Sequence, residues 1–225
     1  MTLLEKMGDG IWSAGLPLRV GALDIGTRTT LVRLPDGGLF VHSPAQLEGL
    51  KAEVDAIGPV RHVVAPNRYH HLFVREWKDA YPDALVHAAP GLAQKRKSFA
   101  FDSELGDEPH EAWRGVLEQH VVRGSPMMNE VVFFHPASRT LVATDLAMNI
   151  QEAPGFLTRT FWKLNGAWQK LGPTRMVRLT FRDKPAVRRS VDRILEWDFD
   201  RVLIAHGRSL ATGGKETLRE VYSFL

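Results

Sequence analysis

The chain has 225 residues, of which 44% are hydrophobic and 24% charged, with a formal net charge of +3. A chain of this composition can bury a sizeable core without disulfide cross-links. Cysteine is absent from the sequence, which excludes disulfides and thiolate metal sites, so any metal must be held by histidine, aspartate or glutamate. The mildly basic balance permits an anionic substrate without indicating nucleic acid.

The first ten residues contain acidic side chains and only a short apolar stretch, so we do not expect them to act as a secretory signal. No uncharged apolar segment approaches the roughly 18 residues that are needed to span a bilayer. We therefore expect a cytoplasmic protein with no membrane partner.

The first half of the chain predicts short strands followed by alternating helices and strands. A helix is expected to start at Ser43–Pro44 and to stop at Gly58–Pro59, because apolar residues recur between them at helical spacing. Around it we expect strands over residues 27–34, 39–42, 62–65 and 85–88, and a helix over residues 72–81.

The second half repeats this order after residues 95–124, which carry no readable pattern. A hairpin is expected over residues 130–144, a strand over 202–205, and helices over 153–171, 184–197 and 215–225. The basic residues between Arg175 and Arg189 are expected to span a strand and the start of a helix. No linker divides the chain, so we expect one domain over residues 1–225, with two packed sheets and helices outside them.

Three apolar runs end at residue types that metal ions favour. One run leads into His70–His71, the second ends at Asp145, and the third ends at His206 before Gly207. A buried strand delivers its last side chain to the rim of its sheet, where sites are usually built. Adjacent histidines at one helix start point about 100° apart, so a favourable bend is needed for both to reach one ion.

With these residues in view, the chain resembles the metallo-β-lactamase-like hydrolase superfamily over nearly its whole length. In that family an early strand ends in His-x-His-x-Asp-His, a hairpin strand in Thr/Ser-Gly-Asp, and a late strand in Gly-His-Gly. Leu141–Asp145 looks like the second motif, and Leu203–Gly207 looks like the third. The resemblance implies an α/β fold, an αββα sandwich of two mixed β-sheets flanked by helices.

The first motif is degraded in this sequence. Pro66 and Arg68 stand where its first two histidines belong, and His70 stands at its aspartate. His71 takes the last histidine position, while His42 replaces an aspartate that commonly ends an early strand. Members of the family hold two metal ions. The resemblance therefore implies that one of these two metal sites is lost here and that the ligands of the other remain. These ligands are His70, His71, Asp145 and His206.

The resemblance implies a metal-dependent hydrolase with one divalent ion, Zn²⁺ before Fe or Mn, acting on a small molecule. We expect the substrate to be anionic, because Arg68 would repel a second metal and could bind an anionic group. Glu130 is expected as a substrate-binding residue, a further oxygen ligand or a proton carrier, or else as a solvated carboxylate at the hairpin end. His42 is expected to border the same cleft and to contact the substrate, or else to pack. Asp145 is alternatively a helix N-cap.

Other readings stay open. The family has a third histidine that would fall within residues 125–128, where this sequence has none. Loss of three family ligands also fits a non-catalytic protein of this fold, without metal, that acts as a binding or scaffold module. A nucleic-acid binder, based on the basic residues near Phe161 and Trp162, is less favoured because such aromatics more often form core. The aromatic-rich residues 156–168 could lie at an interface in a homo-oligomer.

The remaining histidines have no converging partners in the sequence and are expected to be structural or solvent-facing; they are His62, His87, His110, His120 and His135.

Overall fold

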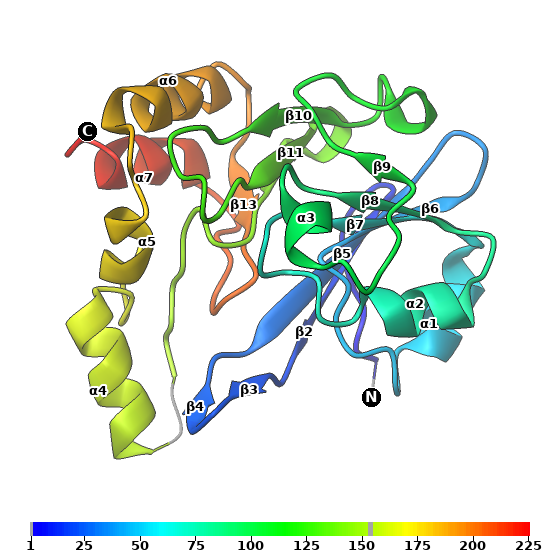
Figure 1. The fold of residues 1–225 in the computed structure, drawn as a ribbon, viewed down its shortest axis with the longest axis horizontal. Helices are drawn as coiled ribbons and strands as arrows, with labels where there is room; N and C mark the ends of the chain where they lie inside the picture. The colour runs from blue at the N-terminus through cyan, green and yellow to red at the C-terminus, as the bar shows by residue number, and fades with distance from the viewer. Residues whose placement is uncertain (1, 153–154) are drawn as a thin grey trace.

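Two β-sheets lie face to face at the centre of the computed structural model, which describes residues 2–152 and 155–225 (Figure 1). The larger sheet has the strand order β1-β2-β5-β6-β7-β8-β9. It is antiparallel from β1 to β6 and parallel from β6 to β9. Its strands are β1 (Glu5–Gly8), β2 (Ile11–Leu16), β5 (Thr27–Arg33), β6 (Leu39–His42), β7 (Val60–Ala65), β8 (Leu85–Ala88) and β9 (Ser103–Glu104).

The smaller sheet has the order β10-β11-β12-β13 and is also mixed, because only β12 and β13 run parallel. Its strands are β10 (Glu118–Val121), β11 (Val131–His135), β12 (Thr140–Val142) and β13 (Arg201–Leu203). A separate two-stranded hairpin is formed by β3 (Arg19–Val20) and β4 (Leu23–Asp24).

Side-chain alternation along the strands builds three apolar layers. In β11, Val131 and Phe133 pack between the sheets, whereas Val132 and Phe134 pack under the helices. This is the period of two that a β-strand imposes. Phe133 and Phe40, from the two different sheets, meet edge to face with ring centroids 5.1 Å apart. The two sheets therefore pack against each other through the apolar side chains that alternate along their strands.

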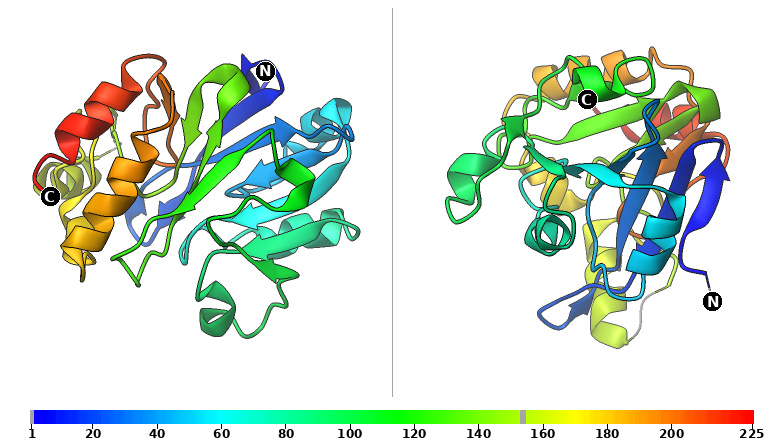
Figure 2. Two further views of the ribbon diagram at one scale, coloured as in Figure 1. Left: turned by 90° about the horizontal axis from the view of Figure 1, so that it is seen from above. Right: turned by 90° about the vertical axis from the view of Figure 1, so that its right-hand side faces the viewer.

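Helices cover both outer faces of the sandwich (Figure 2). The larger sheet carries α1 (Lys51–Ile57), α2 (Val74–Ala80) and α3 (Leu92–Lys95). The smaller sheet carries α6 (Lys184–Ile194) and α7 (Gly214–Val221), while α4 (Phe156–Asn165) and α5 (Arg175–Leu179) lie along one edge in Figure 1. Two short 3₁₀ turns complete the set, η1 (Glu111–Trp113) and η2 (Pro136–Ser138). The predicted αββα architecture is confirmed.

Two local predictions were wrong. The helix expected from Ser43 begins only at Lys51, because Ser43 has a φ of 54° and residues 43–50 turn before the helix starts. The strand expected among the basic residues is instead the helix α5. Thr174 caps the start of this helix, because its side chain accepts a hydrogen bond from the amide of Val177. A polar cap of this kind favours a helix over a strand.

The helix predicted over residues 153–171 is shorter in the structure. Its first two predicted residues lie outside the described part of the chain. The observed α4 ends at Gly166, whose φ of 77° suits a residue without a side chain. In residues 2–152 and 155–225, none of the helices is long and apolar enough to cross a membrane.

Candidate metal centre

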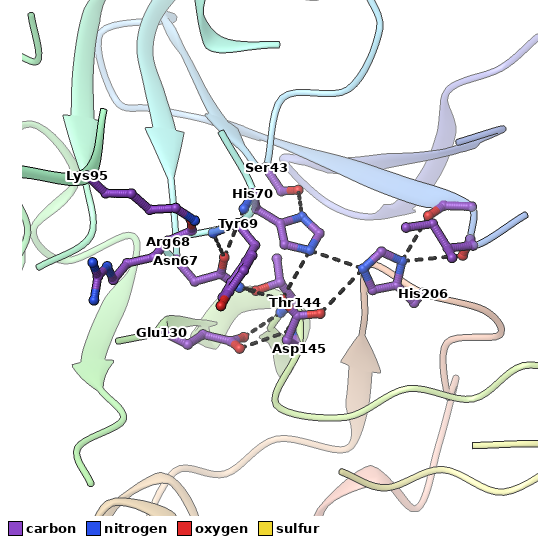
Figure 3. A network of polar contacts seen from close by, with 12 residues as sticks. Ser43, Asn67, Arg68, Tyr69, His70, Lys95, Glu130, Thr144, Asp145 and His206 are labelled. Carbon is purple, nitrogen blue, oxygen red and sulfur yellow. Dashed lines mark hydrogen bonds and ion pairs between the residues drawn. The ribbon is translucent and has the colours of Figure 1, made fainter. Parts of the chain in front are cut away.

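Three strand ends bring two imidazoles and a carboxylate together. His70 follows β7, Asp145 follows β12 and His206 follows β13 (Figure 3). The His70 Nε2 and His206 Nε2 atoms are 3.1 Å apart. The Asp145 carboxylate lies 3.4 Å from each, through Oδ2 to His70 and Oδ1 to His206. All three side chains are at most 8% exposed.

These separations fit the coordination shell of a divalent ion. In a tetrahedral zinc site with bonds of about 2.0–2.1 Å, neighbouring ligand atoms are about 3.3 Å apart. The two 3.4 Å separations involve different carboxylate oxygens, and one ligand atom from each of the three residues lies within 4.8 Å of the others. Two imidazole nitrogens and a carboxylate are a donor set that zinc and iron both accept. The cluster formed by His70, Asp145 and His206 is thus chemically and geometrically suited to hold one cation.

The outer hydrogen bonds orient both imidazoles toward the centre of the cluster. The Nδ1 of His206 lies 2.8 Å from the carbonyl oxygen of Gly26. A carbonyl only accepts, so Nδ1 carries a proton, and Nε2 is the ring nitrogen that would bind an ion after losing its own proton. On the other side, His70 Nδ1 contacts the hydroxyl of Ser43 at 2.9 Å. Metal-binding histidines are commonly fixed in this way.

The charges in the cluster are strongly coupled. Burial would raise the pKa of Asp145, but the charge of His70 and hydrogen bonds with both histidines hold it well below the usual range. Burial would lower the pKa of His206, yet the hydrogen bond and charge of Asp145 outweigh it, so the pKa is raised. Asp145 is therefore an anion at neutral pH, as a metal-binding carboxylate must be.

Asn67 ties the strand ends together and was missed by the sequence reasoning. Its buried amide group donates to Asp145 Oδ2 at 2.7 Å and to Thr144 Oγ1 at 2.8 Å. Its carbonyl oxygen accepts from the backbone amides of Tyr69 and His70, at 2.7 and 2.9 Å. The available signal was an asparagine two residues after a strand, since such side chains bond to the backbone two or three residues ahead.

The structure separates the two neighbouring histidines of the predicted ligand set. His71 lies outside the cluster, and its Nδ1 accepts a hydrogen bond of 2.6 Å from Arg96. Burial, together with the charges of Arg96 and Lys95, lowers the pKa of His71 to about 4. The favourable bend that would bring both rings to one ion is absent from this turn. His70 alone reaches the cluster.

Glu130 lies beneath the cluster as a support of the loop, so its expected solvated position was wrong. Its side chain is buried and accepts the backbone amides of Thr144 at 2.6 Å and Asp145 at 2.9 Å. Burial and the charge of Asp145 raise the pKa of Glu130 to about 8. These two bonds fix the turn that presents Asp145. The residues after Asp145 form a turn and not a helix, so Asp145 is not a helix N-cap.

Arg68 and His42 flank the cluster without joining it. Arg68 Nη1 donates to the carbonyl of Pro126 at 2.6 Å, and its guanidinium points away from the histidine pair (Figure 3). His42 is buried edge to face on Phe133, with centroids 5.5 Å apart. Burial and the charge of His70 lower the pKa of His42 to about 3. His42 thus packs in the core beside the cluster.

A pocket of about 630 Å³ adjoins His206. Gly26, whose carbonyl holds His206, and Gly207, which follows it, both line this pocket. The other lining residues come from residues 17–25, from residues 150–152 and from the residue after Gly207. They are Pro17, Leu18, Asp24, Ile25, Ile150, Gln151, Glu152 and Arg208. The wall is mostly apolar with a few charged groups, as small-molecule sites usually are.

The backbone at Gly207 allows His206 to approach its neighbours closely. Gly207 has a φ of +89°, and a Cβ there would lie 2.1 Å from the carbonyl oxygen of Asn149. We expect Gly207→Ala to lower the free energy of unfolding by more than about 2 kcal/mol, measured by urea denaturation. Gly10→Ala is the matched control, because Gly10 also has a positive φ of +68° but open space around it. Equal losses in the two variants would show that the close contact is unimportant.

A second group of histidines converges on β7 and β8 of the larger sheet, which the sequence reasoning did not anticipate. His62 Nδ1 and His87 Nε2 are 3.0 Å apart, and the rings of both pack on Trp113. His110 stacks on the same indole. Burial, then the charges of the neighbouring histidines, lowers the pKa of His87 to about 3.

This shift predicts an acid sensitivity. The unfolded chain takes up a proton at His87 near pH 6.5, whereas the folded chain does so only near pH 3. The stabilising effect is therefore complete above pH 6.5 and is lost as the pH falls toward 3. Between pH 6.5 and 5.5 we expect wild type to lose about 1 kcal/mol more than His87→Gln in urea denaturation. Parallel pH profiles would contradict this assignment.

Comparison with solved structures identifies the class of fold. The DIM-1 metallo-β-lactamase matches with a TM-score of 0.68 at 15% identity, covering 98% of this chain and 96% of its own. The metallo-β-lactamase from Pontibacter korlensis matches with 0.68 at 14% identity, covering 99% of both chains. The Flv1 flavodiiron core from Synechocystis sp. PCC6803 matches with 0.69 at 11% identity, covering 98% of this chain and 60% of its own. The chain has a metallo-β-lactamase-like fold.

The family follows from the sequence itself. Residues 8–170 match the model of the family described as "Domain of unknown function (DUF4336)", and the chain belongs to that family. A comparison with curated proteins gives no match.

Proposed function

We propose that the chain is a metal-dependent hydrolase that holds a single divalent ion at His70, Asp145 and His206. The observation that carries this proposal is the set of separations of 3.1–3.4 Å between potential ligand atoms that arrive from three different strand ends. The orientation of His206 by the Gly26 carbonyl supports it, because that bond leaves the ring nitrogen facing the cluster free to bind an ion.

The residues around the cluster have distinct roles in this proposal. Asp145 supplies the negative charge, and Asn67 holds its carboxylate in place. Ser43 and Gly26 orient the two imidazoles from behind. A divalent ion bound there would lower the pKa of a coordinated water and polarise a carbonyl or phosphoryl group. Zn²⁺ is the proposed ion because the donor set suits a tetrahedral site, with Fe or Mn as alternatives.

The pocket beside His206 is the proposed place for a small-molecule substrate. Its volume of about 630 Å³ lies in the range of ligand sites. Arg208 supplies a positive charge in the wall, and Asp24 and Glu152 supply negative ones. An anionic substrate remains our proposal from the net positive charge of the chain, with Arg208 rather than Arg68 as its partner.

A non-catalytic binding module is the second candidate. Arg68 stands where the family resemblance puts a metal-binding histidine, and it is anchored there through its backbone amide to Met128 and its side chain to Pro126. A two-ion mechanism therefore has no support in this chain, and a protein that keeps the fold for binding alone would look similar at this position.

A metal-dependent activity screen separates the two candidates. Purified protein would be incubated with ester, thioester, lactam and phosphoester substrates, with zinc, iron or manganese added in turn. The hydrolase proposal predicts turnover of at least one class that a chelator removes and that His206→Ala lacks. Turnover that survives both the chelator and His206→Ala would assign the activity elsewhere, and inactivity on every class would favour the binding module.

A further inference from the structure

The edge formed by α4 and α5 exposes large apolar side chains. Phe156 and Leu157 begin α4 with 79% and 70% of their surface exposed, and Leu179 ends α5 with 80% exposed. Leu164 and Met176 add to the same two helices, with more than half of their surface exposed. We call these five residues the apolar edge. Scattered exposed leucines are ordinary, but a group on two successive short helices marks an interaction surface.

The geometry of α4 places its apolar side chains to one side of the helix. At 100° per residue, Phe156, Leu164 and Leu157 fall within an arc of about 100° on the outward face. Thr158 and Trp162 fall on the opposite face and are buried against the body of the protein. The inner face therefore holds α4 on the protein, while the apolar side chains of the outward arc are exposed to solvent.

The charges around the apolar edge are all of one sign in the sequence. Between Glu152 and Asp183 the chain has no acidic residue. It has six basic ones, all exposed in the structure: Arg159, Lys163, Lys170, Arg175, Arg178 and Arg182. On α4, Lys163 and then Arg159 follow the apolar arc on one of its two sides. The nearby Asp24 of β4, an element that packs on α4, is already paired with Arg19 at 3.4 Å.

We propose that the apolar edge docks on an anionic lipid bilayer, with α4 lying in the plane of the membrane surface. Apolar side chains flanked by lysine and arginine are the pattern of helices that insert into the headgroup boundary, and each basic residue adds attraction to anionic lipid. A second copy of the chain fits less well, because a two-fold contact would bring the same basic residues together. Nucleic acid would neutralise the charge but offers no place for the leucines.

This proposal revises the expectation of no membrane partner, which was drawn from the lack of a segment that spans a bilayer. A surface-bound helix needs no such segment. The docking proposal is independent of the metal centre, because no residue of the apolar edge belongs to the cluster or lines the pocket.

Vesicle flotation tests the proposal. Wild-type protein would be mixed with vesicles of phosphatidylcholine alone and with vesicles containing about 30% phosphatidylglycerol, at about 50 mM and about 500 mM NaCl. We expect flotation only with the anionic vesicles and a marked loss at the higher salt. The variant Phe156→Ser/Leu157→Ser should bind at least about tenfold more weakly, and so should Arg159→Glu/Lys163→Glu.

Matched variants exclude general effects of the substitutions. Leu72→Ser removes a side chain that is 53% exposed outside this edge. Lys6→Glu/Lys97→Glu makes the same change in net charge at exposed positions in β1 and in the loop after α3. Both controls should float like wild type, and thermal unfolding should show every variant folded.

Three results would overturn the proposal. The first is that wild-type protein stays unbound to anionic vesicles at low salt. The second is a dimer in light scattering that Phe156→Ser/Leu157→Ser dissociates, which would assign the edge to a second copy of the chain. The third is binding of a single-stranded oligonucleotide that competes with vesicles and is unchanged in Phe156→Ser/Leu157→Ser, which would assign the basic residues to nucleic acid.

Discussion

Replacement of Asp145 by alanine is expected to weaken zinc binding by more than about 100-fold, the upper end of what losing an outer-shell partner costs. Asp145 would be the anionic ligand of the centre, and its oxygens lie 3.4 Å from both imidazole nitrogens. Removal of the carboxylate leaves two neutral imidazoles, which hold a divalent ion less strongly. Competition with a chromophoric chelator measures the affinity directly.

Two further variants make that measurement specific. Asp145→Asn keeps the size of the side chain and a partner for Asn67, and it should lose affinity in the same direction. Asp107→Ala is the control, because Asp107 also lies between a histidine and a cation, 3.1 Å from His120 and 2.5 Å from Arg123. Unchanged zinc affinity in Asp145→Ala, or an equal loss in Asp107→Ala, would remove Asp145 from the ligand set.

Replacement of Trp113 by alanine is expected to lower the free energy of unfolding by about 3–5 kcal/mol. The indole is fully buried between the sheets, where it meets Phe40 with centroids 5.1 Å apart. Its Nε1 also donates to Gln119 at 2.9 Å, so the variant leaves both a cavity and an unpaired amide oxygen.

Urea denaturation measures this loss, with Trp12→Ala as the control. Trp12 lies on β2 and is only partly buried, so we expect a clearly smaller change there. A loss below about 1 kcal/mol for Trp113→Ala would mean that the segment around it is not part of the core.

The fold was predictable because its signals are local. The apolar runs before Asp145 and His206 form β12 and β13, and each strand ends three residues before the polar side chain. The family resemblance then implied the four layers of the fold, which are two sheets between two layers of helices. Trp113 lies in a segment whose sequence shows no regular period. Only its contacts with residues of the larger sheet show that it belongs to the core.

The detail of the candidate site was missed because one local turn decides it, and the asparagine that forms this turn was overlooked in the sequence. Asn67 accepts the amides of Tyr69 and His70, and this turn directs His70 to the cluster and His71 to Arg96. The choice between two adjacent histidines depends on that turn and not on their residue type. The buried position of Glu130 likewise depends on two amides that lie 14 and 15 residues further along the chain.

The metal content of the purified wild-type protein is the most direct test of the proposed centre. Protein from cells supplied with zinc, iron or manganese would be analysed by elemental mass spectrometry beside His206→Ala prepared in the same way. We expect about one divalent ion per wild-type chain and far less in His206→Ala, as a single three-ligand site requires. A wild-type protein that carries no stoichiometric metal under any of the three supplements would contradict a metal centre at His70, Asp145 and His206.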